Sequence, residues 1–297
     1  MVTLPLLVLT ACAPADEPSG SGSSGATSSG ATSSDGTSSD ATSATSAVAC
    51  AAGALPTIAD RLFTVGTDDP AYEPWFADND PTNGRGYESA VAYAVADRLG
   101  YEKDAVTWAT ATFTNAIAPG VKNFDVDVNQ ISITDERRQT VDFSSGYYDV
   151  AQAVVALDSS PIAGVTTIAA LKNAKLGAQV GTTSYRTITE TIAPSQQPLV
   201  FDTNDLAKQS LVNGQIDGLI VDLPTGLYLA AAELEGAKVV GQFPVTGDVE
   251  QFGFVLDKGS ALTSCVSGAV EELRADGTLA TIQQQWFTSS TGAPELS

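Results

Sequence analysis

The segment that decides the fold reads NQISITDERRQTVDFSSGYYD and runs from Asn129 to Asp149. It follows FDVDV, in which apolar and polar residues alternate as in a half-buried β-strand. Small hydroxyl residues, two adjacent arginines and an apolar return at VDF come next. In an acidic chain, Arg137 after a strand end lined with polar side chains needs an explanation, whereas the adjacent Arg138 is expected to be a solvated neighbour.

The composition excludes several classes of function. The chain has 297 residues and a formal net charge of −21, from 35 acidic and 14 basic residues. Binding to nucleic acid requires clustered Lys and Arg, so we expect no nucleic-acid partner. The charge favours a soluble monomer. The absence of histidine excludes His-based catalysis and most zinc sites, and we expect no metal and no cofactor.

The N-terminal segment has features of an exported, anchored protein. MVTLPLLVLTAC is an apolar run that is too short to span a bilayer, and it resembles a lipoprotein signal peptide over residues 1–12 with a lipobox ending at Cys12. We expect Cys12 to be lipidated. An ordinary apolar N-terminus is the alternative. Residues 13–50 are predicted to form a disordered tether, because Ser, Gly, Thr, Ala and Asp alone make up 19–47.

The rest of the chain alternates between predicted strands and helices, which indicates parallel βαβ units. The predicted strands end at Gly66 or cover 106–110, 124–130, 175–182, 199–203, 217–222 and 237–243. The predicted helices cover 88–100, 113–121, 166–174, 183–192, 204–214, 224–236, 261–277 and 278–287. These elements are too many for a single small sheet.

Six segments carry a resemblance to a known family. In order they are VGTDDPAYEPW, GYESAVAYAVADRLGY, ISITDERRQTVDFSSGYYD, LGAQVGTTS, LVNGQIDGLIVD and LRADGTLATIQQQWF. Each is weak alone, but together and in this order the run 62–287 resembles the periplasmic solute-binding proteins for polar amino acids. These proteins are the receptors of ABC importers.

The resemblance implies an α/β, two-lobed periplasmic-binding-protein-like fold of type II. Two crossing strands would join the βα lobes, with the ligand in the interlobe cleft. Lobe 1 would comprise 51–152 and 247–288, lobe 2 would comprise 153–246, and 289–297 would be a C-terminal tail. Physical reasoning agrees with a cleft site, because ligands of open α/β sheets bind outside the carboxyl ends of the strands.

The resemblance also implies a function for the segment from Asn129 to Asp149. In similar proteins, the arginine at the position of Arg137 binds the ligand α-carboxylate, which matches the planar, permanently charged guanidinium. Ser132 would add its hydroxyl and N–H, and Gln130 would offer its carbonyl to the ligand ammonium. A structural ion pair of Arg137 with Asp135 or Glu136 is the alternative.

Lobe 2 would contact the same zwitterion. Thr183 and Ser184 lie where a strand passes into a helix, and free N–H groups at a helix start favour an anion. The alternative, a simple helix cap, shares this geometry. By resemblance, Asp222 at the end of a buried strand binds the ammonium. Its alternative is an N-cap of the following helix.

The side-chain pocket would come from lobe 1. Tyr72, Trp75 and Phe113 would flank the ligand's apolar stem, although each could instead belong to the core. Asp69 is predicted to face the cleft, with neighbouring Asp68 left open. Further charged residues near these segments are Glu73, Glu88, Arg85 and Arg186. The acids favour a cationic or amide side chain, and the arginines favour an acidic one.

Two cysteines remain, Cys50 and Cys265. An exported protein can form disulfides; Cys50 lies where the chain enters the predicted lobe 1, and Cys265 lies on a predicted helix of that lobe. We predict that they are bonded, with two free thiols as the alternative.

The sequence therefore predicts a binding protein and not an enzyme. We expect an amino-acid ligand, an ABC permease as partner, and a lipid anchor on the outer face of the cell membrane. The main alternative is an exported enzyme that resembles cyclohexadienyl dehydratase on the same fold. Such an enzyme would need a general acid in the cleft, for which Glu73 and Glu88 are candidates.

Overall fold

The computed structural model describes residue 50 and residues 52–287 and 292–297. The predicted lipidation site Cys12 and the predicted tether up to residue 49 lie outside these residues. No helix within the described ranges is long and apolar enough to cross a membrane.

The first sheet has five strands in the order β2-β1-β3-β12-β4. Strand β1 pairs in parallel with β2 and β3, and β12 runs antiparallel between β3 and β4. The bounds are β1 Phe63–Thr67, β2 Val106–Thr110, β3 Val126–Asp127, β4 Val141–Phe143 and β12 Val255–Asp257. All five residues of β1 are buried, which fits a central strand covered on both faces.

The second sheet repeats this topology. Its order is β10-β6-β9-β7-β8, with β7 parallel to β8 and β9, and β6 antiparallel between β9 and β10. The bounds are β6 Gln152–Leu157, β7 Leu176–Gln179, β8 Leu199–Phe201, β9 Gly218–Asp222 and β10 Ala237–Gln242. Each sheet contains three parallel strands, which are β1, β2 and β3 in the first sheet and β7, β8 and β9 in the second. Read from the edge, their order is second, first, third, and an antiparallel strand follows the third. The carboxyl ends of the parallel strands thus form one edge in each sheet, where ligand sites are expected.

The chain passes between the two sheets along a short antiparallel ribbon. Strand β5 (Tyr148–Val150) pairs with β11 (Glu250–Phe252), and these strands immediately precede β6 and β12. We refer to the first sheet with its helices as lobe 1 and to the second sheet with its helices as lobe 2.

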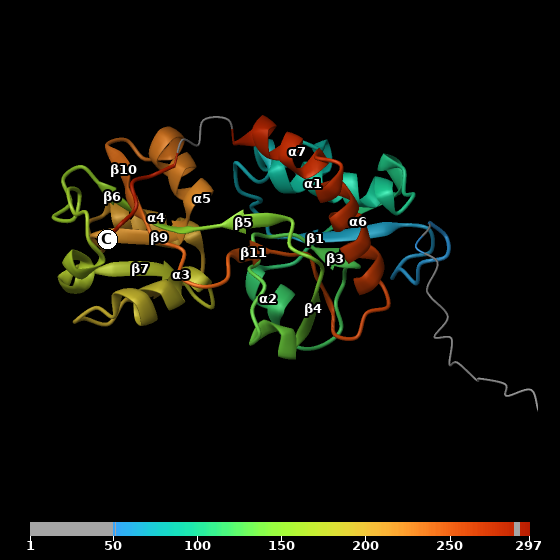
Figure 1. The fold of residues 1–297 in the computed structure, drawn as a ribbon, viewed down its shortest axis with the longest axis horizontal. Helices are drawn as coiled ribbons and strands as arrows, with labels where there is room; N and C mark the ends of the chain where they lie inside the picture. Colours follow the sequence, from blue (N-terminus) through green and yellow to red (C-terminus); the bar gives the residue numbers. More distant parts are fainter. Residues whose placement is uncertain (1–49, 51, 288–291) are drawn as a thin grey trace, which may run out of the picture. The chain divides into compact units, whose positions relative to one another are not determined.

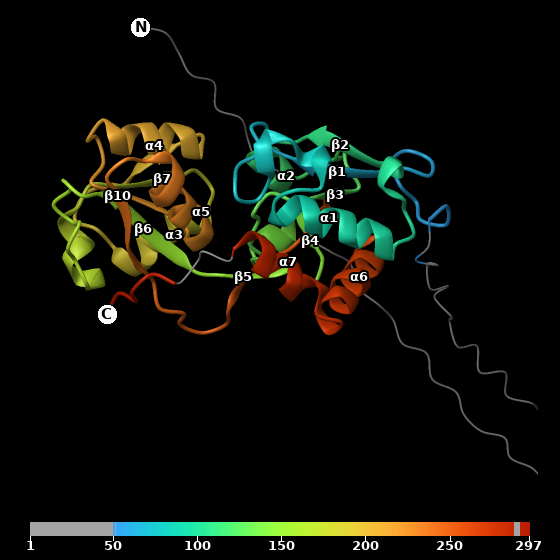
Figure 2. The same ribbon diagram turned by 90° about the horizontal axis from the view of Figure 1, so that it is seen from above.

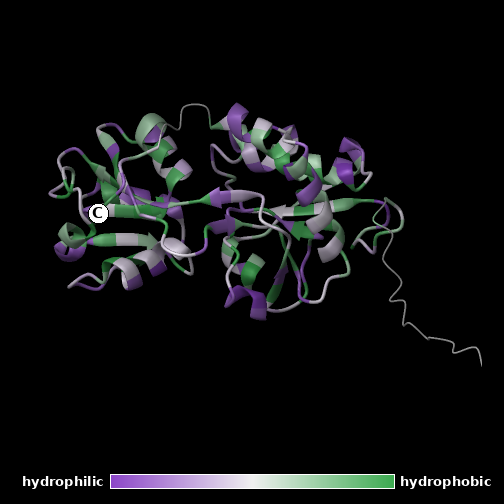
Figure 3. Cartoon of the chain, in the orientation of Figure 1, coloured by the Kyte–Doolittle hydropathy of each residue, from purple (hydrophilic) through white to green (hydrophobic). Residues whose placement is uncertain are grey.

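The larger part of the lobe 1 core lies between its sheet and three helices that pack against one another, α1, α6 and α7 (Figure 1), and a smaller cluster includes Phe113, Phe143 and Val255. The helices of this lobe are α1 Tyr87–Arg98, α2 Phe113–Ile117, α6 Thr263–Ala275 and α7 Thr278–Trp286. Figure 3 shows both hydrophobic and hydrophilic residues on α1 and α6, as expected for helices with one buried face.

The core of lobe 2 has two parts because neighbouring strand residues point to opposite faces. Val154 packs with Ile188 and Ile220, whereas the adjacent Val155 packs with Leu211 and Leu219. The helices are α3 Thr183–Arg186, α4 Asn204–Val212 and α5 Leu223–Tyr228. Both α3 and α5 continue into π-helical turns, Thr187–Ile192 and Leu229–Glu233.

The last residues of the chain pack on lobe 2, although the sequence indicated only a tail. Gln242 of β10 donates to the Pro294 carbonyl and accepts from Leu296 N–H, both at 2.9 Å. The Leu296 side chain is buried in the core of lobe 2. Figures 1 and 2 both show the C-terminus beside this sheet. Gly241 allows this approach, because a Cβ there would lie 2.7 Å from Leu296.

Cys50 and Cys265 form the predicted disulfide, with 5.3 Å between their Cα atoms. Cys265 lies on α6 and is buried in the core of lobe 1. The bond therefore fixes the beginning of the folded region to lobe 1.

Candidate ligand-binding site

Residues from both lobes line a cavity of about 30 Å³. Lobe 1 contributes Asp68, Tyr72, Phe113, Asn129, Gln130, Ser132 and Arg137, and lobe 2 contributes Gln179, Thr182, Thr183, Ser184, Asn204 and Asp222. One water molecule needs roughly 10–15 Å³ by the same measure, so the space is small. An amino acid fits only if the walls move apart, and we therefore interpret this arrangement as closed.

Arg137 is the buried cation of the site. It begins a short 3₁₀ turn (Arg137–Gln139) and is 8% exposed. Its Nη1 donates to the Ser132 carbonyl at 2.6 Å, and its Nη2 donates to the Gly181 carbonyl of lobe 2 at 2.9 Å. The guanidinium lies over the Phe113 ring at 5.3 Å. Burial lowers the pKa of Arg137 to about 10, which leaves the group charged at neutral pH. No ion pair with Asp135 or Glu136 is found among the described residues.

Asp222 is the acid that lobe 2 supplies. It ends β9 and stands at the N-cap of α5, but its side chain forms no capping hydrogen bond. Its Oδ1 accepts from Gln152 Nε2 at 2.7 Å. Burial, together with the charge of Glu250, raises the pKa of Asp222 to about 8. A carboxylate that is costly to ionise gains most from a cation placed beside it.

Two residues of the crossing region connect these groups. Gln152, on β6, is 5% exposed, and its Oε1 accepts from the Ser184 hydroxyl at 2.7 Å. Its Nε2 lies within hydrogen-bond distance of Asp222, Thr183 and Glu250. Since the amide has only two N–H donors, these acceptors compete for it. Glu250, on β11, also accepts from the Ser132 hydroxyl.

The loop before α3 brings two hydroxyl groups to the cavity. Thr182 is the helix cap, because its hydroxyl accepts from Tyr185 N–H at 3.1 Å. Thr183 and Ser184 are therefore not needed as caps, and both are buried at the cavity wall. Gly181 turns the chain at φ 72°, in the left-handed region that glycine tolerates.

The three predicted aromatic residues have different locations. Tyr72 and Phe113 line the cavity, and the Tyr72 hydroxyl donates to Asp205 of α4 at 3.2 Å. Trp75 does not reach it. Trp75 is fully buried in an aromatic cluster of lobe 1, in edge contact with Tyr87, Tyr148, Phe252 and Phe287. The structure therefore corrects Trp75 from pocket wall to core.

The structure also corrects the prediction that Asp69 faces the cleft. Asp69 is exposed and does not line the cavity, whereas its neighbour Asp68 does. Asp68 accepts from Phe113 N–H at 3.3 Å, and burial raises its pKa. The chain turns at this point, so only one of two consecutive side chains can face inward. Arg186 lines two outer grooves and not the cavity.

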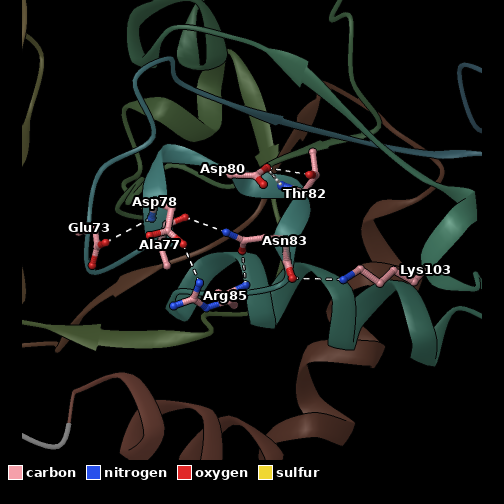
Figure 4. Close-up of polar contacts among 8 residues, drawn as sticks. All are labelled: Glu73, Ala77, Asp78, Asp80, Thr82, Asn83, Arg85 and Lys103. Atoms are coloured by element: carbon pink, nitrogen blue, oxygen red, sulfur yellow. Dashed lines mark hydrogen bonds and ion pairs between the residues drawn. The ribbon is translucent and has the colours of Figure 1, made fainter.

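Glu73 and Arg85 belong to a separate surface network (Figure 4). Glu73 accepts from Asp78 N–H at 3.2 Å, and Arg85 forms an ion pair with Asp78 at 2.6 Å. Neither residue lines the cavity. Glu88 does not line it either, since its side chain is fully buried beneath Gln130.

Sequence reasoning missed four cavity residues, Asn129, Gln179, Thr182 and Asn204. Gln179 ends β7, Asn129 follows β3 closely, and Asn204 begins α4 after β8. These three lie at the carboxyl ends of parallel strands, and so does Thr182, which follows β7 at the start of α3. A search for polar residues at these positions would have found them.

The comparisons with known proteins agree with this geometry. Residues 63–289 match the family described as bacterial extracellular solute-binding proteins, family 3. The chain belongs to this family. The type II two-lobed fold predicted from the sequence is thereby confirmed.

Three relatives illustrate the similarity. A glutamine-binding protein of an ABC transporter from Bacillus subtilis is 31% identical over 218 residues, which cover 71% of this chain and 77% of the relative. The structure of an ancestral arginine-binding protein bound to arginine is 30% identical, with a TM-score of 0.63 over 76% of this chain and 98% of that one. An ancestral amino acid-binding protein, a precursor of cyclohexadienyl dehydratase, is 28% identical with a TM-score of 0.62 over 76% and 95%.

Proposed function

We propose that this protein captures a free amino acid between its two lobes and delivers it to an ABC-type importer. One observation carries the proposal: a buried cation from lobe 1, Arg137, and a half-buried acid from lobe 2, Asp222, line the same small cavity. A zwitterion carries the complementary pair of charges on adjacent groups. A ligand of this kind would neutralise both residues at once.

Each end of the zwitterion has suitable partners. The α-carboxylate would take the guanidinium of Arg137 and the hydroxyls of Ser132, Thr183 and Ser184, since charge-assisted hydrogen bonds are strong in a buried site. The ammonium would lie against Asp222 and the Gln130 carbonyl. To accept the carboxylate, Arg137 would exchange its present bonds to backbone carbonyls for bonds to the ligand.

The remaining wall supports a polar, cationic or amide side chain. Asp68 adds a negative charge, and Asn129, Gln179 and Asn204 add groups that donate and accept hydrogen bonds. Tyr72 and Phe113 would contact the aliphatic stem. An acidic side chain would meet Asp68 without a compensating cation, since Arg186 lies outside the cavity. The relatives named for glutamine and arginine support this class.

Capture would proceed by closure of the lobes. Among the described residues, four hydrogen bonds or close polar contacts already cross between the lobes: Tyr72–Asp205, Trp75–Thr225, Ser132–Thr183 and Arg137–Gly181. A ligand that contacts both lobes stabilises the closed form relative to the open one. The closed, loaded monomer would then dock on the permease, with a lipid on Cys12 holding it at the outer face of the membrane.

A thermal-shift screen of the purified protein tests this function. The ligands are the twenty amino acids with ornithine, citrulline and cystine. A ligand at a thousandfold excess over its Kd stabilises the native state by about 4 kcal/mol. We expect one or two polar amino acids to raise the melting temperature by several degrees. If none shifts a well-folded sample, the proposal is wrong.

The alternative is a dehydratase, favoured only by the similarity to a precursor of cyclohexadienyl dehydratase. The two acids considered for general acid catalysis, Glu73 and Glu88, do not line the cavity. We therefore prefer a binding function. Turnover of arogenate or prephenate by the purified protein would reverse this preference.

A further inference from the structure

Gln130 has an unusual backbone conformation at the edge of the candidate site. Its φ is 49°, in the left-handed region where the Cβ of an L-residue crowds the neighbouring carbonyl. It lines the cavity two residues before Ser132. Strained conformations of this kind persist only where the surroundings hold them, and they concentrate at functional sites.

Glu88 holds Gln130 from below. Its Oε1 accepts from Gln130 N–H at 2.7 Å, and its Oε2 accepts from the side-chain amide of the same residue. The Tyr147 hydroxyl donates to Oε1. Two bonds to one residue, at the peptide N–H and at the amide, fix both its backbone and its side chain.

The position of Glu88 is itself well defined. It lies in the first turn of α1 and is fully buried. Its N–H donates to the Trp75 carbonyl at 3.0 Å. Gly86 allows this contact, because a Cβ there would lie 2.4 Å from the same carbonyl. Helix α1 thus holds the carboxylate of Glu88 in a fixed position beneath the cavity wall.

The environment of Glu88 makes its charge sensitive to pH. Burial raises the pKa of Glu88 to about 7, against the opposing effect of its hydrogen bonds. The titratable groups that interact with it are Tyr87 of its own helix, Asp127 of β3, Tyr147 before β5 and Asp222 of β9. Asp127 is also buried, with no hydrogen-bond partner for its carboxylate among the described residues, and it interacts further with Asp68 and Lys122. Protonation of Glu88 would turn one acceptor oxygen into a donor and weaken its hold on Gln130.

We propose that Glu88 is a positioning residue for ligand binding: it holds Gln130 in the left-handed conformation at the cavity wall, and amino-acid affinity falls when this hold is lost. The inference rests on the proposed function for its ligand. Glu88 acts through Gln130 and does not touch the ligand. Its effect should therefore depend on which residue occupies position 130.

A double-mutant cycle uses this dependence. Glycine adopts positive φ without strain, so Gln130→Gly should need no residue to hold it. L-arginine and L-glutamine are titrated calorimetrically at pH 8 into the wild type, Glu88→Gln, Gln130→Gly and the double variant. We expect Glu88→Gln to weaken binding by at least tenfold in the wild-type background and by less than threefold in the Gln130→Gly background. Equal losses in both backgrounds, or no loss in either, would overturn the proposal.

A ligand-free measurement separates this inference from the proposed function. In the wild type, the backbone and side-chain amide resonances of Gln130 should titrate with a midpoint near pH 7. They should not do so in Glu88→Gln. If the wild type binds no amino acid but Gln130 titrates, the proposed function fails and the hold on Gln130 stands. If the Gln130 resonances neither titrate in the wild type nor differ between the wild type and Glu88→Gln, the hold itself is wrong. Glu88→Asp, which draws the carboxylate back by one methylene, takes the place of Glu88→Gln in this comparison if Glu88→Gln does not fold.

Discussion

The hydroxyl oxygens of Ser132 and Thr183 lie 3.3 Å apart, although Ser132 belongs to lobe 1 and Thr183 to lobe 2. Both hydroxyls also contact the polar network of Gln152 and Glu250 in the crossing region. The candidate site is therefore complete only when the lobes meet. Binding and lobe closure should respond together to changes in these residues.

Replacing Arg137 should abolish tight binding. Removing one partner of a buried charge pair costs about 2–5 kcal/mol, so Arg137→Ala should weaken amino-acid affinity by at least about 30-fold. Arg137→Lys should recover little, because an ammonium cannot reproduce the planar fork. Calorimetric titration measures both effects. The control is Arg138→Ala, which removes an exposed arginine at the next position. A similar loss for Arg138→Ala would indicate a general charge effect and contradict the assigned role.

Arg137 also shows how far the sequence predicts this site. Eight of the ten residues predicted to contact a ligand, largely by resemblance, line the cavity: Gln130, Ser132, Arg137, Thr183, Ser184, Asp222, Tyr72 and Phe113. Their roles toward a ligand remain predictions. The sequence could not decide between Asp68 and Asp69, because a turn selects which of two adjacent side chains points inward.

Other features depend on contacts that are distant in sequence. Trp75 follows a loop and resembles a pocket residue, but residues from β5, β11 and the end of α7 enclose it. Gln152 and Glu250 lie on strands that read as ordinary crossings, and they meet only when the ribbon forms. Strand β3 is shorter than its alternating pattern predicts, since only Val126–Asp127 pair with neighbours. Local periodicity therefore predicts the type of an element more reliably than it predicts the length of that element.

Asp222 should make both binding and stability depend on pH. The ammonium needs the ionised carboxylate, so affinity should fall as pH decreases below about 8. Stability of the ligand-free protein should change in the opposite direction. The folded pKa lies above the ordinary value of 3.8, so the protonated form favours folding, and this contribution is lost as pH rises from about 4 through about 8.

Asp222→Asn should reduce the pH dependence of both ligand affinity and ligand-free stability. We expect weaker binding at all pH values and a smaller decrease of the ligand-free melting temperature between pH 5 and pH 8. Thermal melts and titrations at matched ionic strength measure them. Some decrease should remain in the variant, because burial also raises the pKa of Glu88. An unchanged melting profile in Asp222→Asn would show that the carboxyl group of Asp222 does not titrate in this range.

The bond between Trp75 and Thr225 should contribute to closure. Trp75 Nε1, in lobe 1, donates to the Thr225 hydroxyl of α5 at 3.0 Å. Thr225→Val keeps the shape and removes the acceptor, at a cost of about 0.5–1.5 kcal/mol to the closed form. We expect affinity to fall by roughly two- to tenfold through a lower closed population. Thr189→Val is the control, since within the described part of the chain the Thr189 hydroxyl bonds only to its own helix. Equal affinities for Thr225→Val and Thr189→Val would show that the bond between Trp75 and Thr225 does not contribute to closure.

Leu296 should stabilise lobe 2 from the end of the chain. Its side chain is 1% exposed in a core that includes Val154, Ile220 and Val240. Truncation of a buried leucine costs about 2–5 kcal/mol, so Leu296→Ala should lower the melting temperature by several degrees. Leu206→Ala is the matched control, because Leu206 lies on α4 of the same lobe but is 47% exposed, and its loss should cost much less. Equal melting temperatures for Leu296→Ala and the wild type would show that the C-terminal residues do not stabilise this lobe in solution.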